Sequence, residues 1–279
     1  MADERRGRRP IARILTSCAL LLLVWARGSA NAPTTVRVLT YNIHHGEGRD
    51  GLLDLSRLSA VITSVQPDLV ALQEVDVETT RVGGVNQLDT LAQLTGMHAT
   101  FGKAMDYMGG GYGVAVLSRW PVVGTVSEPL PSSPDREPRT ELTVEVRAGS
   151  GGPLIQFTST HLDQGLPEER LTQAEYLNEL LIRNDVPGIL AGDMNARPNT
   201  EVMKIFEPWW TVALPFDPGA ITTPPRPLLR GDHVLFRPYA SWRQVESRFI
   251  DDTIASDHRP VLVVLEWLGP QDSSSPPAH

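Results

Sequence analysis

The sequence predicts an α/β domain in which sheets and helices pack in layers. Two observations lead to this fold class. Apolar, strand-like segments alternate along nearly the whole chain with segments whose apolar residues recur at helical spacing. Some strand-like segments also follow one another directly, as they do in hairpins. Strands interleaved with helices and with hairpin-like pairs are typical of a layered α/β domain.

The first half of the chain supplies two strands and two helices in alternation. Residues 36–42 read as a strand that ends in a polar cluster, and residues 54–65 as a helix that follows Asp54, a residue type that caps helix N-termini. Residues 68–74 read as a short buried strand. The helix predicted over 86–96 begins with asparagine and ends with glycine, as helices commonly do.

The second half contains most of the remaining strands. The longest predicted helix, residues 167–184, has proline in its first turn, where the missing N–H is not needed. Residues 215–230 are proline-rich and are predicted to form a loop. Segments 232–238 and 241–250 follow that loop. The other predicted strands have apolar bodies and span residues 112–118, 140–147, 153–161, the segment that ends in Gly192-Asp193-Met194-Asn195, and 260–267.

The two ends of the chain are expected to lie outside the domain. Residues 1–32 have the layout of a signal peptide: a positive RRGRRP stretch, an apolar ILTSCALLLLVWA and a small-residue GSANA with an Ala-x-Ala pattern. The apolar stretch is short for a membrane span. We therefore expect export, to the periplasm or out of the cell, with cleavage after Ala32. One domain is expected over 33–269 and a disordered tail over 270–279.

Charge and cysteine content restrict the partners of the mature chain. Residues 1–32 hold six of the 25 basic and two of the 33 acidic residues, so residues 33–279 carry a net charge of −12. The only cysteine, Cys18, lies in the expected signal peptide, which leaves no disulfide. Lys103 and Lys204 are the only lysines. Because lysine and arginine dominate affinity for nucleic acid, this composition disfavours extended binding to DNA.

Polar and ionisable side chains stand at the ends of the predicted strands. Any one of them has a local explanation as a turn or cap residue, but turn chemistry does not require Glu, Asp and His at successive strand ends. Strand side chains at i and i+2 share a face, so Asp193 and Asn195 are expected to point at one spot before Pro198 ends the strand. The residues at strand ends are Asn42, Glu74, Tyr112, His161, Asp193, Asn195, Asp232, Asp257 and His258.

Eight short motifs follow in a fixed order between residues 36 and 267: TYNIH, LQEVD, GYGVAVLS, EPRTEL, STHLD, GDMNARP, GDHVLF and SDHRP. In this order the chain resembles the endonuclease/exonuclease/phosphatase superfamily, which includes DNase I-like nucleases, inositol phosphatases and sphingomyelinases. The resemblance implies a four-layer α/β sandwich, with two packed mixed β-sheets flanked by helices. It places the site where strand ends of both sheets converge.

The resemblance also implies a metal site. Glu74 is the main carboxylate for Mg²⁺ or Mn²⁺, with Asn42 and Asp257 beside it; such hard oxygen ligands suit these ions. Some members place an aspartate two residues after the first asparagine, where this chain has His44. One ion is therefore implied, and a second only if His44 takes a softer metal. The alternative for the His44-His45 pair is a loop without a role.

Catalytic roles follow from the same resemblance. Asp193 orients or deprotonates the attacking water, and Asn195 hydrogen-bonds a phosphate oxygen. His258 lies against the phosphate, held by Asp232 through its other ring nitrogen, and His161 is a second phosphate-facing histidine. Tyr112 and Arg139 complete the anion pocket.

These expectations describe an exported, metal-dependent phosphoesterase that hydrolyses its substrate by in-line attack of an activated water. The acidic composition favours a small or lipid-linked substrate, and no obligate protein partner is evident. A secreted nuclease and a non-catalytic binding module with the same fold are the alternatives. Segments 78–89, 101–113 and 215–230 are expected to set specificity, with Arg81 and Lys103 reaching the substrate.

Overall fold

The computed structural model describes residues 34–213 and 231–270. The expected signal peptide, the proline-rich segment 215–230 and nearly all of the expected tail therefore lie outside the described residues. Among the residues that are described, no helix is long and apolar enough to cross a membrane.

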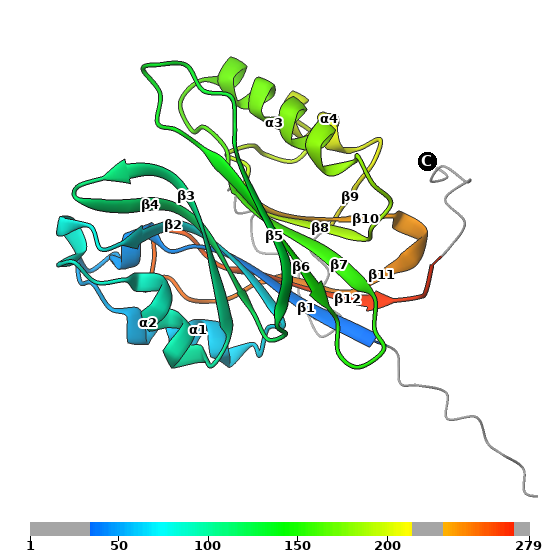
Figure 1. Cartoon of the computed structure of the whole chain (residues 1–279), viewed down its shortest axis with the longest axis horizontal. Helices are drawn as coiled ribbons and strands as arrows, with labels where there is room; N and C mark the ends of the chain where they lie inside the picture. Colours follow the sequence, from blue (N-terminus) through cyan, green and yellow to red (C-terminus); the bar gives the residue numbers. More distant parts are fainter. Residues whose placement is uncertain (1–33, 214–230, 271–279) are drawn as a thin grey trace, which may run out of the picture. The chain divides into compact units, whose positions relative to one another are not determined.

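Within the described residues, two six-stranded sheets form the centre of the fold. Figure 1 shows the helices on the outer sides of these sheets. The first has the order β11-β12-β1-β2-β4-β3, and the second the order β5-β6-β7-β8-β10-β9. In the first sheet the strands are β1 (Thr34–Asn42), β2 (Leu69–Val77), β3 (His98–Tyr107), β4 (Gly110–Ser118), β11 (Trp242–Phe249) and β12 (Val261–Trp267). In the second they are β5 (Val122–Pro129), β6 (Thr140–Arg147), β7 (Leu154–His161), β8 (Gly188–Asp193), β9 (Thr211–Val212) and β10 (Asp232–Arg237).

Each sheet is mixed, because it contains one parallel pair among antiparallel neighbours. β1 and β2 run parallel, as do β7 and β8. A parallel pair needs a crossover, and here a helix supplies it in each sheet. In the part of the chain that the structure describes, the helices are α1 (Leu55–Ser64), α2 (Gln87–Thr95), α3 (Pro167–Leu181) and α4 (Glu201–Phe206). Short 3₁₀ turns span His44–Gly46, Thr80–Val82 and Tyr239–Ser241.

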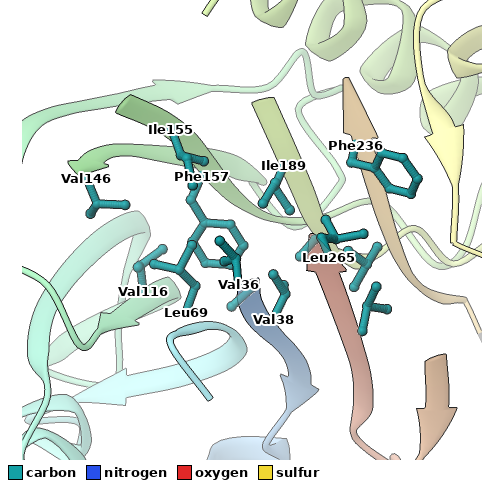
Figure 2. Close-up of a cluster of buried hydrophobic side chains, with 14 of the residues drawn as sticks. Val36, Val38, Leu69, Val116, Val146, Ile155, Phe157, Ile189, Phe236 and Leu265 are labelled. Carbon is teal, nitrogen blue, oxygen red and sulfur yellow. The ribbon is translucent and has the colours of Figure 1, made fainter. Parts of the chain in front are cut away.

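Three apolar layers hold these elements together. The inner faces of the two sheets meet in a core in which Val38 and Val116 of the first sheet oppose Phe157 and Ile189 of the second (Figure 2). A second layer lies between the first sheet and α1 and α2, and a third between the second sheet and α3 and α4. This arrangement confirms the predicted four-layer sandwich, with helices outside two packed mixed sheets.

The observed helix boundaries agree with the predicted ones where a capping residue marks the boundary in the sequence. The side chain of Asp54 accepts a hydrogen bond from the N–H of Arg57, and Asn86 caps α2 in the same way. Gly96 ends α2 with a φ of 69°. The helix predicted to reach residue 184 instead ends at Leu181, where the guanidinium of Arg237 donates to the carbonyl oxygens of Leu181 and Asn184.

The glycine-rich segment 101–113, predicted to be a specificity loop, is a β-hairpin. β3 and β4 are joined by a two-residue turn, Met108-Gly109, whose φ angles of 45° and 84° suit a tight hairpin. Neither β3 nor β5 was predicted from the sequence. Both lie at a sheet edge, and most of their side chains are partly exposed, which weakens the apolar signal on which strand prediction depends.

Candidate active site

Sheet register brings three of the predicted residues to one edge. His161 ends β7 and pairs with Asp193 at the end of the parallel strand β8. Asp232 begins the neighbouring antiparallel strand β10 and pairs with Asp193 from the other side. The carboxyl ends of β7 and β8 lie beside the amino end of the antiparallel strand β10, so these three residues lie next to one another at the same edge of the sheet.

Glu74 reaches this edge through a β-bulge. From the sequence, Glu74 was expected to end a strand, but β2 continues to Val77. Within β2, Gln73 and Glu74 both lie opposite a single residue of β4, Val114, which defines the bulge. Glu74 has a φ of 58°, a conformation that non-glycine residues rarely adopt. Bulges of this kind redirect a side chain next to active sites. Here the bulge turns the carboxylate toward Asn42.

Asn42 links the two sheets at the site. Its amide nitrogen donates to Oε1 of Glu74 at 2.8 Å and lies 3.4 Å from Oδ2 of Asp193. Ser256, buried beside the exposed Asp257, donates its hydroxyl to the backbone oxygen of Asn42. The three predicted metal ligands Asn42, Glu74 and Asp257 therefore lie at one edge of the sandwich.

The environment of Glu74 suits a hard cation. Burial raises the pKa of its carboxyl group, and the charge of Asp257 adds to the effect, against the opposing influence of the hydrogen bond from Asn42 and of His44 and His258. Within residues 34–213 and 231–270, no basic side chain forms an ion pair with Glu74. A divalent ion would offset this desolvated charge, and carboxylate and amide oxygens are the donors that Mg²⁺ and Mn²⁺ prefer.

Asp193 is the centre of a polar cluster that it forms with His161, Asp232 and His258. Its Oδ1 accepts a hydrogen bond of 2.9 Å from the backbone N–H of Asn195. Nε2 of His161 and Nε2 of His258 each lie 3.7 Å from its Oδ2. Burial alone would raise the pKa of this carboxyl group, but the cationic His258 and the hydrogen bonds from Asn195 and Asn42 lower it. Asp193 is therefore ionised at neutral pH.

His258 carries a proton on both ring nitrogens at neutral pH. Its Nδ1 lies 2.9 Å from Oδ2 of Asp232, the contact that the family resemblance implies. Burial lowers the pKa of this imidazole, but the hydrogen bond and charge of Asp232, with Asp193 and Asp257, outweigh burial and raise the pKa to about 9. His258 is thus a fixed cation that faces the carboxylate of Asp193.

His161 is neutral, although it faces the same carboxylate. Burial and the nearby Arg139 lower its pKa to about 3. Nη1 of Arg139 lies 2.8 Å from Nδ1 of His161. Because a guanidinium only donates, Nδ1 must be the unprotonated nitrogen, and the hydrogen is on Nε2, directed at Asp193. Arg139 itself is held by Glu137 at 2.9 Å.

Asn195 lies near Asp193 for a different reason from the one predicted. β8 ends at Asp193, and Asn195 has a φ of 46°, so strand alternation does not apply. The turn is closed by the hydrogen bond from the backbone N–H of Asn195 to the side chain of Asp193, and the side-chain amide nitrogen of Asn195 donates to the carbonyl of Leu162 at 2.9 Å. Gly231 packs so closely that a Cβ there would lie 2.4 Å from the nitrogen of Asn195.

A cavity of about 180 Å³ opens beside the cluster and is lined by Glu74, Arg81, Tyr112 and Arg139 among others. Arg81 is fixed by two hydrogen bonds to Asp76, of 2.6 and 2.8 Å. Its guanidinium lies 5.5 Å from the ring centre of Tyr112. Four of the predicted site residues thus meet at this cavity.

One predicted residue does not line the cavity, and several residues that were not predicted do. Lys103 does not line it: its ammonium forms an exposed ion pair with Asp106 on β3, so its contact with substrate stays a prediction. Tyr107, Glu137 and Gln164 line the cavity, and none of them was singled out from the sequence, although Tyr107 lies in segment 101–113 and Glu137 begins the EPRTEL motif. Glu137 lies between β5 and β6, and Gln164 lies between β7 and α3, where no periodicity marks them.

The packed mixed sheets and the carboxylate–histidine cluster at their common edge define a class of protein: hydrolases that act on phosphoester bonds. Residues 39–258 match the model of the Endonuclease/Exonuclease/phosphatase family, and the chain belongs to this family. Members typically depend on a divalent metal, and their substrates include nucleic acids and sugar phosphates.

Solved structures agree with this assignment. An endonuclease/exonuclease/phosphatase from Beutenbergia cavernae is 26% identical, with a TM-score of 0.70 over 84% of this chain and 72% of that one. A mannosyl-6-phosphatase from Bacteroides thetaiotaomicron shares the fold at 20% identity and a TM-score of 0.61, over 82% and 99%. The human Nocturnin catalytic domain does so at 18% and 0.63, over 85% and 96%. No curated protein sequence matches the chain.

Proposed function

We propose that this chain is an exported, Mg²⁺- or Mn²⁺-dependent phosphoesterase that acts on a small or lipid-linked phosphoester. The observation that carries the proposal is the position of the Asp193 carboxylate. It lies between a cationic and a neutral histidine and within reach of the amide that also binds Glu74. A base, proton donors and a carboxylate for a metal at one edge are what in-line phosphoester hydrolysis requires.

Glu74, Asn42 and Asp257 are the residues that would hold the ion. When bound there, the ion would neutralise charge on the non-bridging phosphate oxygens. The protein's own contribution is to keep these oxygen donors ordered. The hydrogen bond from Asn42 fixes Glu74, and the hydroxyl of Ser256 fixes the backbone of Asn42.

The members of the polar cluster have different roles in aligning the water and in donating hydrogen bonds. Asp193, ionised at neutral pH, accepts a hydrogen bond from the attacking water and aligns it. The Nε2–H groups of His161 and His258 both point toward this carboxylate, and we propose that they donate to phosphate or leaving-group oxygens next to it. Asp232 keeps His258 protonated, and Arg139 keeps the proton of His161 on Nε2.

Charge and cavity size support a small substrate over a long nucleic acid. Residues 33–279 carry a net charge of −12 and two lysines, one of which, Lys103, is already paired with Asp106. The cavity of about 180 Å³ fits a compact group, and Arg81 presents a fixed guanidinium on its wall. Export rests on the signal-peptide layout of residues 1–32 alone.

A panel of phosphoesters tests the proposal. The purified protein would be assayed with Mg²⁺, Mn²⁺ or EDTA on bis(p-nitrophenyl) phosphate, p-nitrophenyl phosphate, inositol and sugar phosphates, sphingomyelin and plasmid DNA. We expect metal-dependent turnover of the small or lipid-linked esters, and none by the Glu74→Gln variant. DNA cleavage alone would replace this proposal with the nuclease, and inactivity on every substrate would favour the binding module.

The rate is expected to fall as pH rises through about 9, because His258 loses its proton there. In Asp232→Asn the negative charge that raises this pKa is gone and an amide oxygen accepts only a weaker, neutral hydrogen bond, so burial lowers the pKa relative to that of the unsubstituted protein. The alkaline limb of kcat/KM should therefore move to lower pH by roughly a unit or more. Asp185→Asn, a change at an exposed carboxylate, is the control. An unmoved alkaline limb in Asp232→Asn would show that His258 is not the titrating group.

A further inference from the structure

A second group of possible metal ligands shares Glu74 with the oxygen donors assigned to Mg²⁺, and its other two members are histidines. His44, His45 and Glu74 each bring one ligand atom within 4.8 Å of the others. All three are partly exposed and line the cavity of about 180 Å³, so an ion and a substrate group could both reach them. Two of the three donors are imidazole nitrogens.

The ring of His44 is oriented as a ligand's would be. Its Nδ1 lies 3.1 Å from the backbone oxygen of Glu47. Since a carbonyl oxygen only accepts, the neutral ring carries its hydrogen on Nδ1, which leaves a lone pair on Nε2. Histidines that bind metals commonly donate the other ring N–H to a carbonyl or carboxylate, which fixes the tautomer and the ring orientation.

The backbone places the two histidines side by side. His44 and His45 have φ angles of 47° and 42°, and Gly46 one of 83°. These consecutive left-handed residues curl the chain, so that the two ring centres are only 4.5 Å apart. Such a conformation costs free energy for residues other than glycine and persists only where neighbours hold it. Gln87 does so by donating to the backbone oxygen of His45.

We propose that His44, His45 and Glu74 form a site for a borderline first-row metal ion of the Zn²⁺, Co²⁺ and Ni²⁺ class. Two imidazoles and one carboxylate are a ligand set for such ions, whereas Mg²⁺ takes oxygen donors. Three protein ligands also leave a position open for water or a phosphate oxygen, as in catalytic zinc sites. The inference deepens the proposed function, on which it rests in so far as Glu74 belongs to both ligand sets.

Cobalt supplies the test, because the visible spectrum of Co²⁺ reports its ligands without any substrate. Untagged protein would be titrated with CoCl₂ in the presence of excess Mg²⁺, alongside His44→Asn and His45→Asn. Asparagine tolerates positive φ better than most residues, so these variants retain the loop. The control is His98→Asn, at an exposed histidine at the start of β3.

We expect each of the two loop variants to bind Co²⁺ at least about 10- to 100-fold more weakly, with His98→Asn unchanged. Equal affinity in all three variants would overturn the inference. If a loop variant fails to fold, X-ray absorption at the cobalt edge of the unsubstituted protein decides instead, since imidazole scattering is expected and its absence would refute the site.

The two proposals fail separately. Co²⁺ binding through His44 and His45 in a protein that hydrolyses no phosphoester would refute the proposed function and leave this metal site in place. If turnover depends on Mg²⁺ but Co²⁺ affinity is the same in His44→Asn and His45→Asn as in the unsubstituted protein, this site is refuted and the proposed function stands.

Discussion

Glu74→Gln is expected to abolish Mg²⁺-dependent turnover, with a loss of about 100-fold or more in kcat/KM. The substitution keeps the shape and the hydrogen-bonding oxygen that faces Asn42 but removes the charge that would hold the ion. Because burial raises the pKa of Glu74, its charge is unfavourable in the folded protein without metal. The variant should therefore fold at least as well as the unsubstituted protein.

The measurement is kcat/KM as a function of Mg²⁺ concentration, with Tm measured in EDTA for both proteins. Glu179→Gln, at an exposed position on α3, is the matched control and should behave as the unsubstituted protein. If Glu74→Gln kept its metal-dependent rate, Glu74 would not be the metal carboxylate.

Asp193→Asn is expected to lower kcat by about 100- to 10,000-fold, the range typical of a general base or of the group that aligns the nucleophile. An amide keeps an oxygen for the N–H of Asn195 but can neither take a proton nor face the cationic His258 as a charge. KM should change little, since Asp193 acts on the water and not on the ground-state substrate.

Single-turnover kinetics at saturating substrate separates this loss from slower product release. Asp185→Asn, at an exposed carboxylate, is the control. The pKa of Asp193 is lowered in the folded protein, so its ionised form stabilises the fold above the unfolded pKa, and the contribution is lost as pH falls. Some loss of Tm at neutral pH is consistent with the assignment, but a kcat near that of the unsubstituted protein would exclude Asp193 from the chemistry.

Local signals in the sequence were sufficient for most of the fold. Asp54, Asn86 and Gly96 begin or end helices through bonds between residues a few positions apart, and buried strands such as β12 open with a continuous apolar run. The edge strands β3 and β5 were not recognised, because a half-exposed strand buries too little apolar surface to give a clear pattern. β3 pairs with β4, and β5 pairs with β6. No local sequence pattern reveals these pairings.

The site was predicted less completely, for a related reason. Glu74 was identified as a residue, but the bulge that aims it depends on how β2 pairs with β4. Asn195 was placed next to Asp193 by strand alternation, whereas a turn with positive φ does this. Tyr107 lies in segment 101–113 and Glu137 begins the EPRTEL motif, but no local pattern shows that these two side chains reach the cavity wall, because only the packed sheets bring them there.

The family, the layered fold class and the types of the residues at the edge of the sandwich could be predicted from the sequence, because motif order and strand periodicity are properties of the chain. The protonation states of those residues could not be predicted, because they depend on which side chains the fold brings into contact. His161 and His258 are the same side chain and both face Asp193, yet one is neutral and the other charged. The difference comes from their partners, Arg139 and Asp232, which lie 22 and 26 residues away along the chain and come into contact only when the sheets form.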